Sequence, residues 1–125
     1  MRDEVMARIL IAEDDEALRN FLTRSLSRAG HEVTAVGDGL EALPLIAGQN
    51  FDLLLSDIVM PELDGLALAK RAAVLAPAMK VVFITGFAGV ALNPRNGDMP
   101  AGSRILSKPF HLRAVVEAVD QLCAA

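Results

Sequence analysis

The chain has 125 residues and a formal net charge of −4, with 53% hydrophobic and 22% charged residues. A chain of this length fits one domain that buries about two-thirds of its unfolded surface, and the composition excludes a disordered, collagen-like or coiled-coil protein. The acidic balance and the scattered Lys and Arg argue against direct nucleic-acid binding, and the apolar runs are too short for a membrane span. An N-terminus unlike a signal peptide and a single cysteine, Cys123, favour a cytoplasmic protein without an intramolecular disulfide.

Short runs rich in Val, Ile and Leu recur along the chain and predict strands at residues 8–12, 32–36, 51–56, 80–85 and 103–107. Segments with apolar residues at helical spacing lie between and after these runs. The central parts of three runs lack polar alternation, which is typical of parallel strands covered by helices on both faces. The alternation of elements therefore predicts an α/β fold with a doubly wound, five-stranded parallel sheet of the (βα)₅ type.

Two segments of the chain are expected to depart from this regular pattern. Residues 93–102 are rich in Pro, Gly and Asn, which leaves about one to two turns for a helix at 87–92. The fourth helix should therefore be short or irregular. Residues 1–7 precede the first strand and are expected to form a disordered N-terminal extension to a domain that spans 8–125.

Polar side chains stand at the ends of four of the predicted strands. Glu13 and Asp14 follow the first strand, Asp57 follows the third, Thr85 ends the fourth and Lys108 follows the fifth. Each residue alone has an ordinary explanation, such as a favourable charge at a helix N-terminus or a solvated surface lysine. Because the carboxyl ends of parallel strands meet at one edge of a sheet, the group as a whole predicts a ligand site there.

The acidic members of this group suit a small divalent cation. Mg²⁺ takes oxygen ligands and commonly binds through one or two carboxylates, waters and phosphate oxygens. We expect Asp14 and Asp57 to be direct ligands and Glu13 to hold a metal-bound water. The backbone carbonyl of Val59, two residues beyond Asp57, should also reach the cation. The sequence therefore predicts a Mg²⁺ site built from the first and third strands.

A cation site of this kind, next to a hydroxyl and an ammonium group, suits phosphoryl transfer. Asp57 is the expected nucleophile, because a carboxylate can attack the phosphorus in line and form a covalent intermediate. Thr85 and Lys108 would each bind an oxygen of the transferred group. The sequence thus predicts a phosphoacceptor aspartate, with no cofactor other than Mg²⁺.

The motifs around these residues resemble those of the receiver domains of two-component response regulators. The resemblance covers the chain from Arg8 onwards and rests on ILIAEDD at 9–15, DIVMP at 57–61 with DG at 64–65, TG at 85–86 and KPF at 108–110. It implies a flavodoxin-like (CheY-like) fold, a phospho-aspartate at Asp57, dependence on Mg²⁺, and a histidine kinase or histidine phosphotransfer protein as donor. It also implies a signalling protein rather than an enzyme.

The chain departs from most receiver domains at the residues expected to carry the switch. Ile105 stands three residues before Lys108, where these domains have an aromatic side chain that swings between two positions. Any switch or output contact is therefore expected at Ile105, Phe87 and Pro109, through packing of the neighbouring loops. Val59 and Phe87 flank the site without a side-chain hydrogen bond to orient water, so dephosphorylation should be slow.

Longer matching strings narrow the resemblance to the CpdR-like regulators of alphaproteobacteria. These strings are DIVMPELDG at 57–65, FITGFA at 83–88, ALNP at 91–94 and LSKPFHL at 106–112. The narrower resemblance implies a stand-alone regulator without an output domain that receives phosphate from a cell-cycle phosphorelay. It also implies a protein target, namely an AAA+ protease whose substrate delivery is primed by the unphosphorylated form.

Three other functions would use part of the same residue pattern. A haloacid-dehalogenase-like phosphohydrolase would need a second acid two residues after its nucleophile, where this chain has Val59. A flavodoxin-like flavin binder would need a Ser, Thr or Gly phosphate loop after the first strand, where this chain has three acids that repel phosphate. The third alternative is a phosphate sink or relay intermediate without an output partner, which the sequence does not separate from an adaptor.

Overall fold

The structure of the chain, a computed structural model, describes residues 6–58, 60, 63–85, 103–107 and 112–123. Within these residues, strands and helices alternate along the chain, as the sequence predicts. The elements are β1 (Arg8–Ala12), α1 (Glu16–Arg28), β2 (Glu32–Val36), α2 (Gly39–Gly48), β3 (Leu53–Asp57), α3 (Gly65–Leu75), β4 (Lys80–Thr85), β5 (Arg104–Ser107) and α4 (Leu112–Cys123). None of the helices in this described part is long and apolar enough to cross a membrane.

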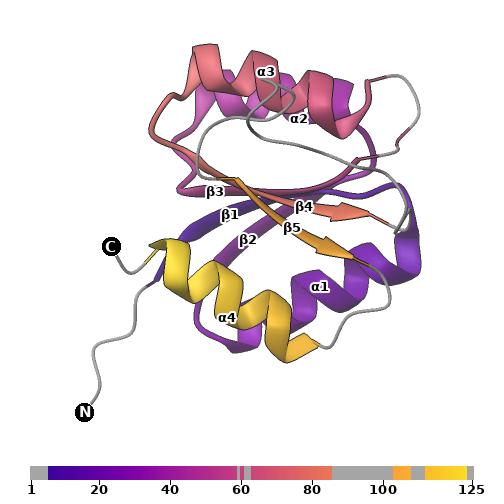
Figure 1. Cartoon of the computed structure of the whole chain (residues 1–125), viewed down its shortest axis with the longest axis vertical. Coiled ribbons are helices and arrows are strands. Elements are labelled where there is room, and N and C mark those ends of the chain that lie inside the picture. The colour runs from indigo at the N-terminus through magenta and orange to yellow at the C-terminus, as the bar shows by residue number, and fades with distance from the viewer. Residues whose placement is uncertain (1–5, 59, 61–62, 86–102, 108–111, 124–125) are drawn as a thin grey trace.

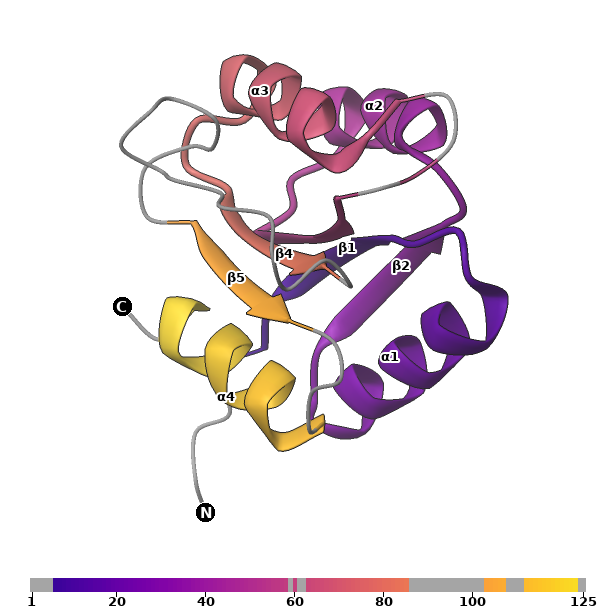
Figure 2. The ribbon, with the colours of Figure 1, turned by 45° about the vertical axis from the view of Figure 1, so that its right-hand side comes forward.

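The strands form one parallel sheet in the order β2-β1-β3-β4-β5. This is the strand order of the flavodoxin-like doubly wound fold, so the predicted fold class is confirmed. The helices α1 and α4 cover one face of the sheet, and α2 and α3 cover the other (Figures 1 and 2). The helix expected at 87–92 lies outside the described residues.

The apolar runs that predicted the strands are explained by this three-layer arrangement. Successive residues of a strand point to opposite faces of the sheet. In β1, Ile9 and Ile11 belong to the core cluster that includes residues of α1 and α4, whereas Leu10 belongs to the cluster that includes residues of α2 and α3. Because both faces are covered, every position in the middle of the strand is apolar and fully buried.

The observed boundaries differ slightly from those read from the sequence. β1, β2 and β4 span the predicted residues, while β3 is Leu53–Asp57 rather than 51–56 and β5 is Arg104–Ser107 rather than 103–107. Phe51 suggested the earlier start of β3, and it is buried, but it lies before the strand. Ala7, placed by the sequence in the N-terminal extension, is 2% exposed and its N–H donates to His31 Nδ1 (3.1 Å), so this residue packs with the domain.

Three helices begin with an aspartate cap, each in the loop that follows one of the first three strands. Asp15, Asp38 and Asp64 each accept a hydrogen bond from the backbone N–H three residues later, at the starts of α1, α2 and α3. Such caps satisfy one of the free N–H groups of a helix start and typically contribute about 1 kcal/mol each. The caps fix where the chain turns from strand to helix, and therefore shape the sheet edge at which the site lies.

Candidate functional site

The candidate site lies between the carboxyl ends of β1 and β3, at the point where the winding of the sheet reverses. β1 is paired with β2 on one side and with β3 on the other, and the register places Ala12 opposite Ser56. The next residues, Glu13 and Asp57, therefore stand side by side. The helices that follow, α1 and α3, lie on opposite faces of the sheet (Figure 2), which leaves the strand ends accessible for a ligand.

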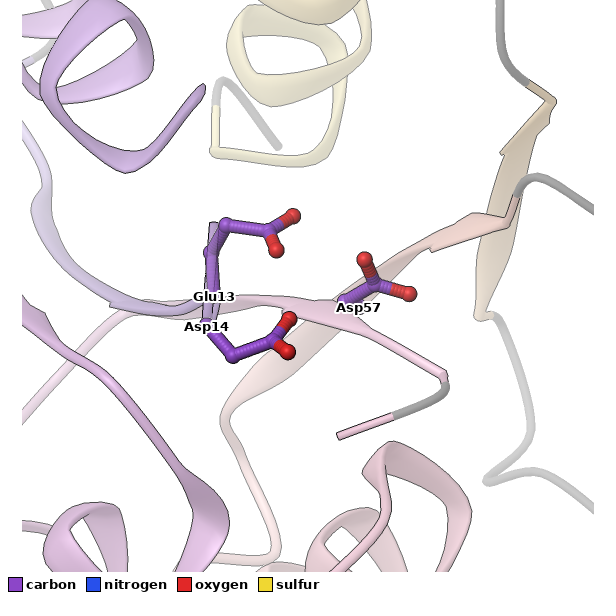
Figure 3. Close-up of side chains that lie close together, drawn as sticks. All are labelled: Glu13, Asp14 and Asp57. Atoms are coloured by element: carbon purple, nitrogen blue, oxygen red, sulfur yellow. The ribbon is translucent and has the colours of Figure 1, made fainter. Parts of the chain in front are cut away.

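Three acidic side chains converge at this position. Glu13 and Asp14, from the loop after β1, direct their carboxyl groups toward the side of Asp57 at the end of β3 (Figure 3). Each offers one oxygen, and these oxygens all lie within 4.8 Å of one another. Glu13 is 1% exposed and Asp57 is 6% exposed, whereas Asp14 is exposed. A set of hard oxygen donors at this spacing fits a small divalent cation such as Mg²⁺.

The position of Asp57 is fixed by a tight return of the chain from β3 into α3. The N–H of Ile58 donates to the carbonyl of Ile84 in β4 (3.0 Å), and the N–H of Gly65 donates back to the carbonyl of Ile58 (2.8 Å). Ser56 Oγ donates to the carbonyl oxygen of Asp57 (2.9 Å). A Cβ atom on Gly65 would overlap this same carbonyl oxygen, so only glycine fits at the first position of α3.

The acidic loop after β1 is held by hydrogen bonds from two neighbouring elements. The N–H of Glu13 donates to the carbonyl of Val36 at the end of β2 (3.1 Å), and Arg19 Nη1 from α1 donates to the carbonyl of Glu13 (2.9 Å). The N–H of Asp15 donates to Glu13 Oε2 (3.0 Å). Sequence reasoning missed Arg19, because the residue stands six positions after Glu13 inside a helix and belongs to none of the motifs at the strand ends.

The remaining predicted site residues are described in part or not at all. Thr85 ends β4 and pairs in register with Ser107 of β5, but its side chain is outside the described part of the structure. Val59, Phe87, Lys108 and Pro109 also lie outside the described residues. Their roles stay predictions.

Ile105, the residue that replaces an aromatic switch, lies in β5 and is partly buried. It packs against a small apolar cluster formed by Ile58, Ala69, Val81 and Phe83. Ile58 directly follows Asp57 in the chain. Ile58 therefore links the two places: it is the chain neighbour of Asp57, and it belongs to the cluster against which Ile105 packs.

Comparisons with known proteins agree with this fold and site. Residues 9–120 match the response regulator receiver domain. The chain belongs to this family. It is 49% identical over 120 residues to the response regulator receiver protein CpdR of Brucella abortus (strain 2308), a match that covers 96% of this chain and 99% of that protein. The resemblance to receiver domains, and to CpdR within them, is therefore confirmed.

Solved structures of response regulators are also similar to this chain. A response regulator receiver protein from Sinorhizobium medicae WSM419 superposes with a TM-score of 0.86 at 32% identity, covering 96% of each chain. The response regulator TrrA of Thermotoga maritima, solved in complex with Mg²⁺-BeF, has a TM-score of 0.82 at 26% identity and covers 94% of this chain and 99% of that one. Receiver domains bind Mg²⁺ at an acidic pocket, and Glu13, Asp14 and Asp57 form an acidic cluster of this kind.

Proposed function

We propose that the chain is a stand-alone, cytoplasmic response regulator in which Asp57 accepts a phosphoryl group from a histidine kinase or a histidine phosphotransfer protein. One observation carries this proposal: three acidic side chains converge within 4.8 Å at the switch point of a receiver-domain sheet. One of them, Asp57, ends the central strand β3. This arrangement supports a carboxylate nucleophile beside a cation site rather than a surface cluster of solvated charges.

The proposed reaction is a direct transfer between two side chains. A carboxylate oxygen of Asp57 forms a P–O bond as the P–N bond to the donor imidazole breaks, and the imidazole nitrogen leaves with the electron pair. The phosphoryl group ends as a mixed anhydride on Asp57. Asp57 is held by backbone contacts on both sides, so its oxygens are presented at the sheet edge without a rearrangement of the loop.

The donor set fits Mg²⁺, with Asp14 and Asp57 as proposed direct ligands and Glu13 as the holder of a bound water. When bound, Mg²⁺ would offset the negative charge that accumulates as a phosphoryl group approaches three carboxylates. The backbone carbonyl of Val59 is proposed as a further ligand. Thr85 and Lys108 complete the proposed site by binding phosphoryl oxygens.

Phosphorylation would then change the surface through charge and packing. The new group adds about −1.5 to −2 charges and three acceptor oxygens beside buried carboxylates. We expect the response to pass through the loops that carry Phe87 and Pro109, and through Ile105, whose apolar cluster includes the neighbour of Asp57. By its resemblance to CpdR-like regulators, the proposed target is an AAA+ protease that binds the unphosphorylated form.

The enzyme alternative has no support at the nucleophile. A haloacid-dehalogenase-like phosphohydrolase needs an acid where this chain has Val59, and the chain belongs to a signalling family. The alternative to an adaptor is a phosphate sink or relay intermediate. Such a protein would have the same phosphorylation site and would differ only in binding no target.

Phosphotransfer from a radiolabelled, phosphorylated histidine phosphotransfer protein tests the proposal. Wild type should take the label only with Mg²⁺, and Asp57→Asn should take none. Glu16→Gln removes an exposed carboxylate in the first turn of α1, close to the site in sequence, and should label like wild type. Equal labelling of wild type and Asp57→Asn would refute Asp57 as the acceptor.

The adaptor role is tested separately, by the affinity for a purified AAA+ protease. If the chain is an adaptor, its unphosphorylated form should bind the protease more tightly than its phosphorylated form. A sink exchanges phosphate with the histidine donor and shows no affinity for the protease in either form.

A further inference from the structure

We propose that Arg19 is a positioning residue for the cation site, because its guanidinium fixes the peptide group that joins Glu13 to Asp14 and thereby aims the Asp14 carboxylate. Arg19 Nη1 donates to the carbonyl oxygen of Glu13 at 2.9 Å. This oxygen belongs to the same planar peptide unit as the N–H of Asp14. The inference rests on the proposed function only in that the cation is taken to be Mg²⁺.

The contact matters because little else determines the direction of Asp14. The side chain is exposed, and within the described residues it makes no hydrogen bond. Its orientation therefore depends on the backbone from which it projects. The preceding residue is anchored at its N–H by the carbonyl of Val36 (3.1 Å), and Arg19 supplies the second anchor, at the carbonyl of Glu13. Together the two anchors hold both peptide groups of Glu13.

The helix is joined to the loop at the same place. The backbone N–H of Arg19 donates to the carbonyl of Asp15 (2.8 Å), while Asp15 Oδ1 caps the helix by accepting from the N–H of Leu18 (3.1 Å). Arg19 therefore stands one turn into α1, on a rigid element, and its side chain reaches back to the strand end. A donor on a rigid helix can hold the loop in one geometry before any ligand arrives.

The guanidinium also lies close to Gly37, the residue directly after β2. Arg19 Nη1 lies 3.5 Å from the point where a Cβ atom of Gly37 would stand, and Glu41 Oε1 lies 3.4 Å from the same point. Glu41 Oε1 in turn accepts from the N–H of Gly37 (3.0 Å). The Arg19 side chain is thus half-buried between the ends of β1 and β2.

Charge adds to the geometric effect. The guanidinium stays protonated at every relevant pH, and a charged donor makes a stronger hydrogen bond to a carbonyl than a neutral one. Loss of Arg19 should therefore weaken cation binding while leaving the ligands themselves in the chain.

The test compares Arg19→Met, which keeps an apolar stem of similar length without the donors, with Arg24→Met as a matched control. Arg24 is exposed on the same helix. Titration calorimetry with Mg²⁺ alone should show dissociation constants about tenfold higher for Arg19→Met, since groups that orient metal ligands typically contribute this much. Arg24→Met should bind like wild type, and Arg19→Lys, which keeps the charge without the fork of donors, should fall between.

A second readout separates positioning from a merely structural role. The Mg²⁺ concentration that gives half-maximal phosphorylation by acetyl phosphate should rise by the same factor in Arg19→Met, while the rate at saturating Mg²⁺ returns to that of wild type. Unchanged Mg²⁺ affinity in Arg19→Met would overturn the proposal, even if the variant were less stable. If Arg19→Met does not fold, Arg19→Gln, which is too short to reach Glu13, gives the same decision.

The two proposals fail in different ways. Weakened Mg²⁺ binding in Arg19→Met, together with a wild type that takes no phosphoryl group from any donor, would support the role of Arg19 and refute the proposed function. A wild type that is phosphorylated on Asp57, with Mg²⁺ affinity unchanged in Arg19→Met, would do the reverse.

Discussion

At the carboxyl ends of β1 and β3, three acidic side chains bring their oxygens within 4.8 Å of one another. At the amino ends of the same sheet, two acidic side chains face hydrogen-bond donors and not other carboxylates. Asp52 Oδ2, before β3, accepts from the N–H of Arg8 (2.8 Å), and Asp120 Oδ1, in α4, lies 3.0 Å from His31 Nε2. The cluster at the carboxyl end brings carboxylates together, although Glu13 Oε2 also accepts from the N–H of Asp15. At the amino end, Asp52 and Asp120 each face a hydrogen-bond donor.

This difference suggests different roles for the two ends of the sheet: ligand binding at the carboxyl end and stabilisation of the fold at the amino end. Like charges held close together repel each other and cost folding free energy unless a cation or another partner offsets them. Carboxylates that accept hydrogen bonds from backbone and imidazole N–H groups stabilise the fold. We therefore expect substitutions at the amino end to change stability without changing phosphorylation. Substitutions at the acidic side chains of the carboxyl end should change ligand binding first.

The largest expected effect comes from the backbone that holds Asp57. Gly65→Ala places a Cβ atom on the carbonyl oxygen of Asp57, so the start of α3 must move away from β3. We expect a loss of about 3 kcal/mol in the free energy of unfolding, as for overpacking of a tight contact. Urea denaturation followed by far-ultraviolet circular dichroism measures it, since the chain has no Trp or Tyr.

Gly48→Ala is the control for that substitution. Nothing lies within 4 Å of the point where its Cβ atom would stand, at the end of α2. Its stability should stay within about 1 kcal/mol of wild type. Equal losses in the two variants would mean that the approach of Gly65 to Asp57 does not limit the fold.

The next effect, at the amino end, concerns His31. Its Nδ1 accepts from the buried N–H of Ala7 and its Nε2 faces Asp120, so His31→Ala leaves a buried N–H without its acceptor. We expect a loss of about 2 kcal/mol in the free energy of unfolding. Asp120→Asn keeps an oxygen acceptor for Nε2 and should cost less. Phosphorylation of His31→Ala at saturating Mg²⁺ should equal that of wild type, and a loss of phosphorylation would break the separation between the two ends.

A smaller effect is expected from the cation itself. If the acidic cluster binds Mg²⁺, a concentration ten times the dissociation constant should stabilise the native state by about 1.4 kcal/mol. Asp14→Asn should lose most of this gain. Asp52→Asn, at the opposite end, should keep it. Thermal unfolding with and without Mg²⁺ checks the prediction, and an equal response of the two variants would contradict it.

The smallest effect concerns the thiol at the amino end. Burial raises the pKa of Cys123, Asp52 and Asp120 raise it further, and Lys80 opposes them. A raised pKa lowers the thiolate fraction at neutral pH, so iodoacetamide should react more slowly with the native protein than with the urea-unfolded chain.

Charge substitutions at the two ends sharpen this comparison. Asp52→Asn removes one of the charges that raise the thiol pKa and should speed native alkylation modestly. Asp14→Asn, at the carboxyl end, should leave the rate unchanged. Equal rates in Asp52→Asn and wild type would show that the charge of Asp52 does not reach the thiol.

The sequence was sufficient for the fold because the strands are buried on both faces. In a chain of alternating strands and helices, uninterrupted apolar runs such as Ile9 to Ile11 indicate buried parallel strands. Three of the five strands have the predicted bounds. The predicted start of β3, at Phe51, was wrong because Phe51 is apolar and buried without belonging to the strand. Hydrophobicity reports burial, and it does not report which buried residues pair in a sheet.

The sequence predicts only those residues of the candidate site whose positions follow from the sheet topology. Glu13, Asp14 and Asp57 follow directly from strand ends, so their convergence could be predicted. Arg19 could not, because its role depends on a side chain that reaches from a helix to a carbonyl six residues earlier. The close approach of Gly65 to Asp57 likewise depends on backbone geometry that no residue pattern specifies.

The central claim, a phosphoacceptor aspartate at the switch point, is tested most directly by intact mass after incubation with acetyl phosphate. Wild type with Mg²⁺ should gain the mass of one phosphoryl group, and wild type without Mg²⁺ and Asp57→Asn should gain none. An adduct of the same size on Asp57→Asn, or a wild type that stays unmodified with both acetyl phosphate and a phosphohistidine donor, would contradict the account.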